Sequence, residues 1–269
     1  MNATLEKSFE LFVRRISLSQ REIGDALNRA EEICQFLSQA TAIHECQVTG
    51  SMAHSTAIQG FSDVDILVAL SPDPSTQSTP HSITAKLLET LKPRYREAYI
   101  SENTVHINFT QGPDVDVIPA IPDTASTNGE ITYRIPSPDR IQWNTYTPAR
   151  RNQEINQKSA LLGSDFVHLI KVIKWWSKHH GQPIASYEIE NFASATYSRR
   201  MPPLTRAIVD FFEFAKTSST QHREDCFTKI SEARAIANKA LRREQQGDIR
   251  GAIDHWGSLL GDQFPSVVS

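Results

Sequence analysis

The chain has 269 residues, of which 39% are hydrophobic and 22% are charged. This composition is typical of a folded globular protein and excludes a disordered chain, a coiled-coil rod and a collagen-like repeat. The sequence contains no run of about 18 apolar residues that would predict a membrane helix. Because the N-terminal residues show no apolar signal region, we expect a cytoplasmic protein with no membrane partner.

Charge and cysteine content narrow the function classes further. The net charge is −3, so no global basic field is available to hold a long nucleic acid, and we see no strong sign of duplex binding. The three cysteines, Cys34, Cys46 and Cys226, are odd in number and form no CxxC pair. We therefore expect free thiols in a reducing compartment and no disulfide.

The first half of the chain changes from helical to strand periodicity. Residues 5–40 have helical periodicity, with a capping box over 19–22. A strand leads into Gly50, and the β-branched run 64–70 predicts another. The proline-rich stretch 71–80 predicts a loop, and a short helix is expected over 81–91. Strands are then expected over 105–109 and 115–118, joined by a turn at 110–113.

The second half is predicted to be helical. Residues 121–151 contain four scattered prolines and are expected to be irregular, whereas helices are expected over 165–180, 186–198, 203–216 and 221–247. This order predicts an α+β fold with a mixed, mostly antiparallel sheet followed by a helical lobe. We expect a core domain at 1–150, which includes the N-terminal helix, and a lobe at 151–269, with the chemistry in the cleft between them.

One short segment carries most of the chemical information. Gly50 and Ser51 end a strand and open a helix, where backbone N–H groups and a hydroxyl can hold a phosphate. Thirteen residues after Gly50, Asp63 and Asp65 flank one residue, so in a strand both carboxylates point to one face. Two adjacent carboxylates repel each other unless a cation lies between them, and Mg²⁺ prefers such oxygen ligands.

A third carboxylate would complete a two-metal site. Asp114 and Asp116 lie about fifty residues further on and share a strand face. An isolated Asp-x-Asp is most often a solvated turn or strand end. The ordered set of Gly-Ser, Asp-x-Asp and a later Asp within apolar strands is more specific, because charges there are costly without a cation or partner.

This set resembles the nucleotidyltransferase superfamily related to DNA polymerase beta. Within it, the chain resembles the cGAS/DncV-like nucleotidyltransferases (CD-NTases), which are related to oligoadenylate synthase and cyclic GMP-AMP synthase. Gly50-Ser51 and Ser62-Asp63-Val64-Asp65 are similar to the first motif of that branch, and 115–120 to its third-carboxylate strand. The resemblance implies that Asp63, Asp65 and Asp116 are catalytic metal ligands, and it leaves Asp114 as a strand-end or supporting acid.

Two further matches lie in the helical half. The run 166–176 resembles the family helix that ends in lysine–aromatic, and the resemblance implies that Lys174 reaches the donor triphosphate, with Lys171 as the weaker candidate. Residues 184–190 resemble the Ser-aromatic-x-x-Glu segment. Ser186 would then bond a phosphate and Tyr187 would stack on the donor base. The alternatives are solvated lysines on an amphipathic helix and an ordinary core tyrosine.

The resemblance implies a metal-dependent nucleotidyltransferase with two Mg²⁺ ions, or Mn²⁺, that uses NTPs with ATP among them. Its product would be a cyclic or short linear oligonucleotide second messenger in bacterial anti-phage (CBASS) signalling, read by a nucleotide-activated effector. Two alternatives remain: a nucleotidyltransferase acting on a tRNA end or a small molecule, and a non-catalytic nucleotide-binding regulator. The bases, linkage and ring size are not fixed by the sequence.

Overall fold

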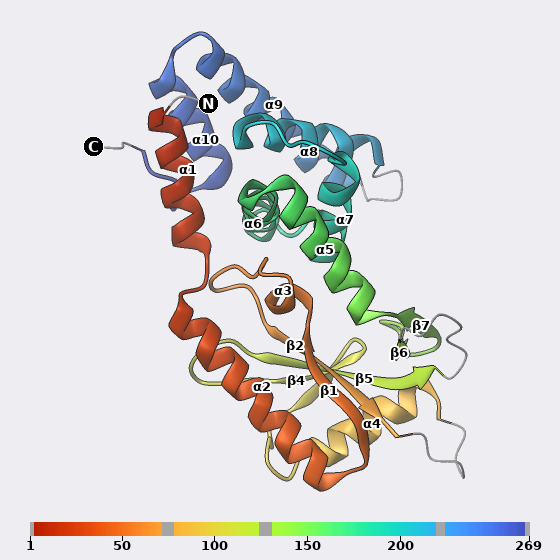
Figure 1. The fold of residues 1–269 in the computed structure, drawn as a ribbon. Coiled ribbons are helices and arrows are strands. Elements are labelled where there is room, and N and C mark those ends of the chain that lie inside the picture. The colour runs from red at the N-terminus through yellow and green to blue at the C-terminus, as the bar shows by residue number, and fades with distance from the viewer. Residues whose placement is uncertain (1–2, 72–77, 124–130, 219–223, 267–269) are drawn as a thin grey trace. The chain divides into compact units, whose positions relative to one another are not determined.

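A computed structural model describes residues 3–71, 78–123, 131–218 and 224–266. The chain forms two compact units (Figure 1). The sheet unit comprises Ser19–Ser55 and Ser62–Glu154, and the helical unit comprises Met1–Leu18, Thr56–Phe61 and Ile155–Ser269. The chain therefore enters the helical unit briefly between Gly50-Ser51 and Asp63. Residues 3–18, which we expected to accompany the sheet, belong to the same unit as the C-terminal helices.

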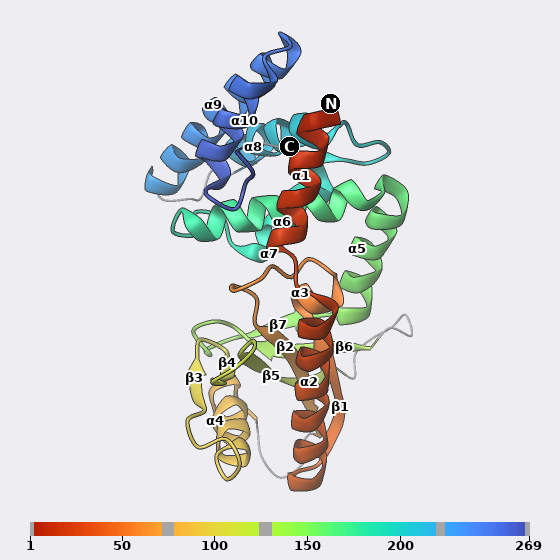
Figure 2. The ribbon, with the colours of Figure 1, turned by 90° about the vertical axis from the view of Figure 1, so that its left-hand side faces the viewer.

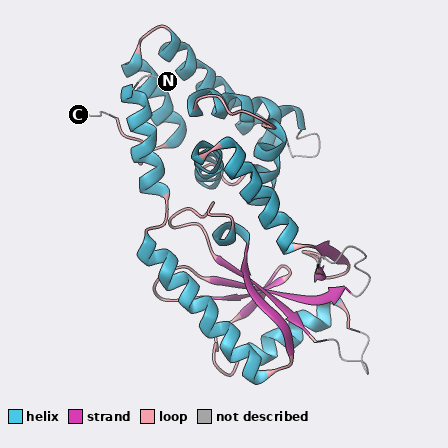
Figure 3. Cartoon of the chain, viewed as in Figure 1, coloured by secondary structure: helices cyan, strands magenta, loops and turns pink. Residues whose placement is uncertain are grey.

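The sheet unit is built on seven strands among the described residues (Figure 3). Their order is β1-β2-β5-β4-β3, with β6 pairing β5 and β7 pairing β6. Only the central pair β2–β5 is parallel, and the other pairs are antiparallel. The strands are β1 (Ile43–Thr49), β2 (Val64–Leu70), β3 (Tyr99–Ser101), β4 (Thr104–Ile107), β5 (Val115–Asp123), β6 (Thr132–Pro136) and β7 (Trp143–Tyr146).

Helices α2 (Gln20–Ala40) and α4 (Pro80–Leu91) pack against the sheet through one buried cluster. Val64, Ile66 and Val68 of β2 belong to this cluster, whereas Leu67 and Ala69 belong to a second cluster with Tyr133. Because successive side chains of a strand point to opposite faces, β2 is buried on both faces over this stretch. This explains why the sequence there is a continuous apolar run and does not alternate.

The helical unit surrounds a second core (Figure 2). It contains α1 (Ala3–Ile16), α6 (Ser164–His179), α7 (Ser186–Thr196), α8 (Leu204–Ser218), α9 (Glu224–Gln245), α10 (Ile249–Leu260) and most of α5 (Pro148–Leu162). Phe9 of α1 packs edge-on against Trp256 of α10, with ring centroids 5.3 Å apart. Among the described helices, none is long and apolar enough to cross a membrane.

The predicted α+β class is confirmed, and most helices lie where their periodicity placed them. The capping box is present: Glu22 N donates to Ser19 Oγ and Ser19 N donates to the Glu22 carboxylate.

The stretch 5–40 is not one helix, because α1 ends at Ile16 before that cap. The prediction of an irregular stretch over 121–151 was wrong, since the end of β5, both β6 and β7, and the start of α5 lie there. The predicted loop at 71–80 lies largely outside the described residues.

The cysteine prediction was also wrong. Cys34 of α2 and Cys46 of β1 form a disulfide with a Cα–Cα separation of 5.7 Å, and only Cys226 is free. The twelve-residue spacing hides this proximity, because a tight connection after Ala40 folds β1 back along α2.

Candidate active site

The connection from β1 to the short helix α3 (Gly50–Ala53) depends on a glycine. Gly50 has φ +61°, a left-handed conformation that favours glycine. A Cβ at this position would also clash with Asp65 Oδ2. The Gly50 backbone therefore lies directly against the Asp65 carboxylate, which the antiparallel register of β1 and β2 places opposite Thr49.

The three predicted acids lie on one face of the sheet. Asp65 and Asp116 are register partners across the parallel pair β2–β5, and Asp63 directly precedes β2. Their neighbours Val64 and Val115 belong to the cluster beneath α2 and α4. Because side chains alternate along a strand, the acids face away from those helices.

A candidate metal-binding group lies on this face. Single ligand atoms of Asp63, His106 and Asp116 lie within 4.8 Å of one another. This spacing is close enough for a hard divalent ion to draw the carboxylates together, and carboxylate oxygen is the ligand that Mg²⁺ prefers. The side chains present thus fit the expected ion. Asp65 falls outside this group among the described residues, and its carboxylate lies instead against Gly50.

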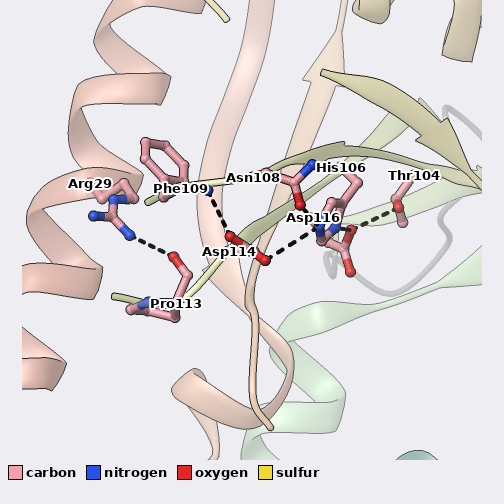
Figure 4. A network of polar contacts seen from close by, with 8 residues as sticks. All are labelled: Arg29, Thr104, His106, Asn108, Phe109, Pro113, Asp114 and Asp116. Carbon is pink, nitrogen blue, oxygen red and sulfur yellow. Dashed lines mark hydrogen bonds and ion pairs between the residues drawn. The ribbon is translucent and has the colours of Figure 1, made fainter. Parts of the chain in front are cut away.

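Two neighbours on β4 hold Asp116 (Figure 4). Thr104 Oγ1 donates to Asp116 Oδ1 over 3.0 Å, and His106 Nδ1 donates to the same oxygen over 2.9 Å. Burial alone would lower the pKa of His106. The hydrogen bond to Asp116 and the negative charges of Asp116, Asp63 and Asp114 together outweigh burial and raise that pKa.

Asp114 supports the turn before β5. Its Oδ1 accepts the Phe109 backbone N–H over 2.7 Å, and its Oδ2 lies 3.6 Å from His106 Nε2. Arg29 of α2 holds the same turn: its guanidinium donates to the Pro113 carbonyl at 2.5 Å and lies 3.9 Å from the centre of the Phe109 ring (Figure 4). These contacts fix the 110–113 turn that joins the two strands.

Lys174 lies in the helical unit and is 3% exposed. Its ammonium donates to Glu190 Oε1 at 2.8 Å and to Thr56 Oγ1 at 2.9 Å, and the Thr56 hydroxyl donates to the same Glu190 oxygen at 2.7 Å. Buried charges persist when they are paired and hydrogen-bonded, as this group is. In this conformation Lys174 ties α6 to α7 and to the Thr56–Phe61 segment.

The other predicted residues of the helical unit differ in exposure. Lys171 Nζ donates to Ser17 Oγ over 3.0 Å, and burial, followed by repulsion from Lys174, lowers its pKa. Ser186 is the first residue of α7. Tyr187 is 67% exposed, so its ring is open to an aromatic partner.

Thr104 and His106 were missed by the sequence prediction, although a signal for them exists. Polar Thr104, His106 and Asn108 alternate with apolar Val105 and Ile107. A hairpin centred on the 110–113 turn would place His106 opposite Val117, whereas the observed register pairs His106 with Asp116, one position away. The predicted strands and turn therefore bring His106 near Asp116 but miss the observed pairing by one residue.

The fold is similar to solved nucleotidyltransferases. A structure of E. coli MS115-1 CdnC in complex with HORMA-deltaN superposes with a TM-score of 0.77 at 14% identity and covers 96% of this chain and 98% of that chain. The CdnC structure with ATP gives a TM-score of 0.74 at 14% identity over 96% and 98%. Vibrio cholerae DncV cyclic AMP-GMP synthase gives 0.61 at 12% identity over 82% and 69%. The fold is thus that of the CD-NTase class of nucleotidyltransferases.

Sequence comparison then identifies the family. The profile of the SMODS domain, the Second Messenger Oligonucleotide or Dinucleotide Synthetase domain, matches residues 3–159, more than half of the chain. The chain belongs to this family, which confirms the resemblance that the motifs indicated. A probable cyclic nucleotide synthase of Bacillus cereus (strain VD146) is 26% identical over 197 residues. That match covers 65% of this chain and 59% of the relative, less than two thirds of the relative's length.

Proposed function

We propose that this chain is a metal-dependent nucleotidyltransferase that converts NTPs, with ATP among them, into a cyclic or short linear oligonucleotide second messenger. The observation that carries the proposal is the convergence of Asp63, Asp116 and His106 on one sheet face, beside Asp65 and the Gly50 turn. Family membership and the name of the Bacillus cereus relative support the same chemistry.

Within this proposal, each acid has a defined part. Asp63 and Asp65 bind both Mg²⁺ or Mn²⁺ ions, and Asp116 helps to bind the catalytic one. Such ions supply the lowered pKa of an attacking hydroxyl and charge stabilisation of the departing pyrophosphate. Gly50 and Ser51 hold the β- and γ-phosphates. The turn at Gly50 supports this, because a residue without a side chain lets the start of α3 lie directly against the carboxylate of Asp65, one of the proposed metal ligands.

The remaining nucleotide contacts come from the resemblance. Ser186 bonds a phosphate, and the exposed ring of Tyr187 stacks on the donor base, a contact that favours bases without choosing among them. Lys174 contacts the triphosphate. That contact requires its ammonium to leave Glu190, with which it is paired here.

The proposed biological setting is bacterial anti-phage CBASS signalling in the cytoplasm, with a downstream effector protein that binds the product. This setting rests on the resemblance to CD-NTases alone. The solved relatives include a CdnG from Bradyrhizobium diazoefficiens in complex with GTP, which supports nucleoside triphosphates as substrates without naming the base.

The direct experiment incubates the purified protein with all four NTPs and Mg²⁺ or Mn²⁺, treats the mixture with phosphatase and analyses it by ion exchange and mass spectrometry. Phosphatase-resistant nucleotides are expected, and their masses identify the bases and the ring size. A parallel reaction contains labelled NTPs and added tRNA. Transfer of the label only to the tRNA would instead support the alternative in which the chain acts on a tRNA end. Saturable NTP binding without turnover under either metal would support a non-catalytic regulator.

A further inference from the structure

Asp116 is held asymmetrically by its neighbours. Thr104 Oγ1 and His106 Nδ1 both donate to Oδ1, over 3.0 and 2.9 Å. Among the described residues, no hydrogen bond reaches Asp116 Oδ2. Because both donors come from β4 in fixed antiparallel register with β5, they restrain the rotation of the carboxylate.

The imidazole is itself fixed from its far side. His106 Nε2 lies 3.2 Å from Asn108 Oδ1 and 3.6 Å from Asp114 Oδ2 (Figure 4). The Tyr99 ring lies beside it, with ring centroids 5.2 Å apart. The His106 side chain is only 13% exposed. A side chain held at both ends and on one face is preorganised to hold Asp116 in one orientation.

We propose that His106, assisted by Thr104, is a positioning residue for the metal site: the two donors occupy Asp116 Oδ1 and present Oδ2 to the divalent ion. This inference rests on the proposed function, since it assigns the residues that orient its third carboxylate. Groups that hydrogen-bond to metal ligands in this way change metal affinity or activity by roughly 10- to 100-fold when replaced.

The test is a titration of the nucleotide-free protein with Mn²⁺ followed by electron paramagnetic resonance, together with the Mg²⁺ dependence of turnover. His106→Ala is expected to weaken Mn²⁺ binding by roughly 10- to 100-fold and to raise the Mg²⁺ concentration for half-maximal rate. The KM for NTP at saturating metal should change little. His106→Asn, whose amide can donate from near the Nδ1 position, should recover part of the loss.

Thr104→Val removes the second donor with little change in volume and should weaken binding less than His106→Ala. Because Thr104→Val leaves His106 in place, it still tests the inference if His106→Ala fails to fold. His81→Ala, on the exposed surface of α4, is the matched control for loss of an imidazole. Mn²⁺ affinity and Mg²⁺ dependence unchanged in His106→Ala and Thr104→Val would overturn the inference. Equal Mn²⁺ binding by the wild type and Asp63→Asn/Asp65→Asn would instead refute the proposed metal site.

Discussion

Asp65 of β2 and Asp116 of β5 are register partners across the only parallel strand pair among the described strands. Parallel pairing aligns equivalent ends of two strands, so acids separated by about fifty residues in sequence emerge at the same level on the same face. The position of the third acid thus follows from sheet topology.

Gly50→Ala tests the fit between the β1–α3 turn and Asp65. The new Cβ would clash with Asp65 Oδ2, and the backbone would keep an unfavourable φ of +61°. We expect loss of turnover by at least about 100-fold and a destabilisation of about 1–3 kcal/mol. Activity assays and urea unfolding measure these effects. Gly60→Ala, which also has positive φ but has open space around its Cβ, is the control and should lose only stability.

The buried pair Lys174–Glu190 makes a prediction about stability. Lys174→Met removes the cation that is paired with the buried Glu190 carboxylate, which should cost about 3–5 kcal/mol in urea unfolding. Lys174→Met/Glu190→Leu removes both charges and should recover most of that loss.

The same two variants test whether Lys174 also contacts the triphosphate. If it does, the double variant should recover most of its stability, but its KM for NTP should stay above that of the wild type. A double variant with normal stability and normal KM would leave Lys174 a purely internal anchor of the Thr56–Phe61 segment.

The Cys34–Cys46 disulfide should stabilise the sheet unit. Closure of a loop of this length contributes about 3 kcal/mol, so reduction should lower the urea midpoint. Thiol titration should find one reactive group, Cys226, before reduction and three after it. Three reactive thiols in the unreduced, folded protein would contradict the pairing, and Cys226→Ser serves as the control for loss of a thiol.

His168 of α6 should make stability depend on pH. Burial lowers its pKa below the ordinary 6.5, partly opposed by Asp165, so the unfolded chain binds the proton more readily. Stability should therefore decrease as pH falls below about 6.5 and continue to fall until the folded-state pKa is passed. In His168→Gln, the midpoint of urea unfolding should change less between pH 7 and pH 5 than it does in the wild type. The same change of midpoint with pH in the variant and the wild type would contradict the assignment.

The sequence predicted the parts of the structure that local pattern determines. The capping box at Ser19 and the apolar run of β2 identify their elements because both signals are contained in a few neighbouring residues. Strands β6 and β7 were missed because prolines and polar residues obscure their alternation, and Pro136 ends β6 at an edge of the pairing. The disulfide was missed because it depends on how β1 folds back on α2.

The candidate site shows the same division. Gly50, Asp63, Asp65 and Asp116 could be predicted as site residues because their spacing forms a motif, whereas His106 requires the hairpin register before its partner can be identified. The ion pair of Lys174 could not be anticipated. Thr56 and Glu190 lie 118 and 16 residues away in sequence, and only tertiary packing brings them to its ammonium.

The assignment of Asp116 as a metal ligand is tested by comparing NTP turnover in Asp116→Asn and Asp114→Asn, with folding checked by circular dichroism. Both variants remove one negative charge from the same strand end, but only Asp116 is assigned to the metal. We expect Asp116→Asn to lose turnover by at least about 100-fold at any Mg²⁺ concentration, whereas Asp114→Asn should keep turnover within about tenfold of the wild type. Equal losses in the two variants, or full turnover in Asp116→Asn, would contradict it.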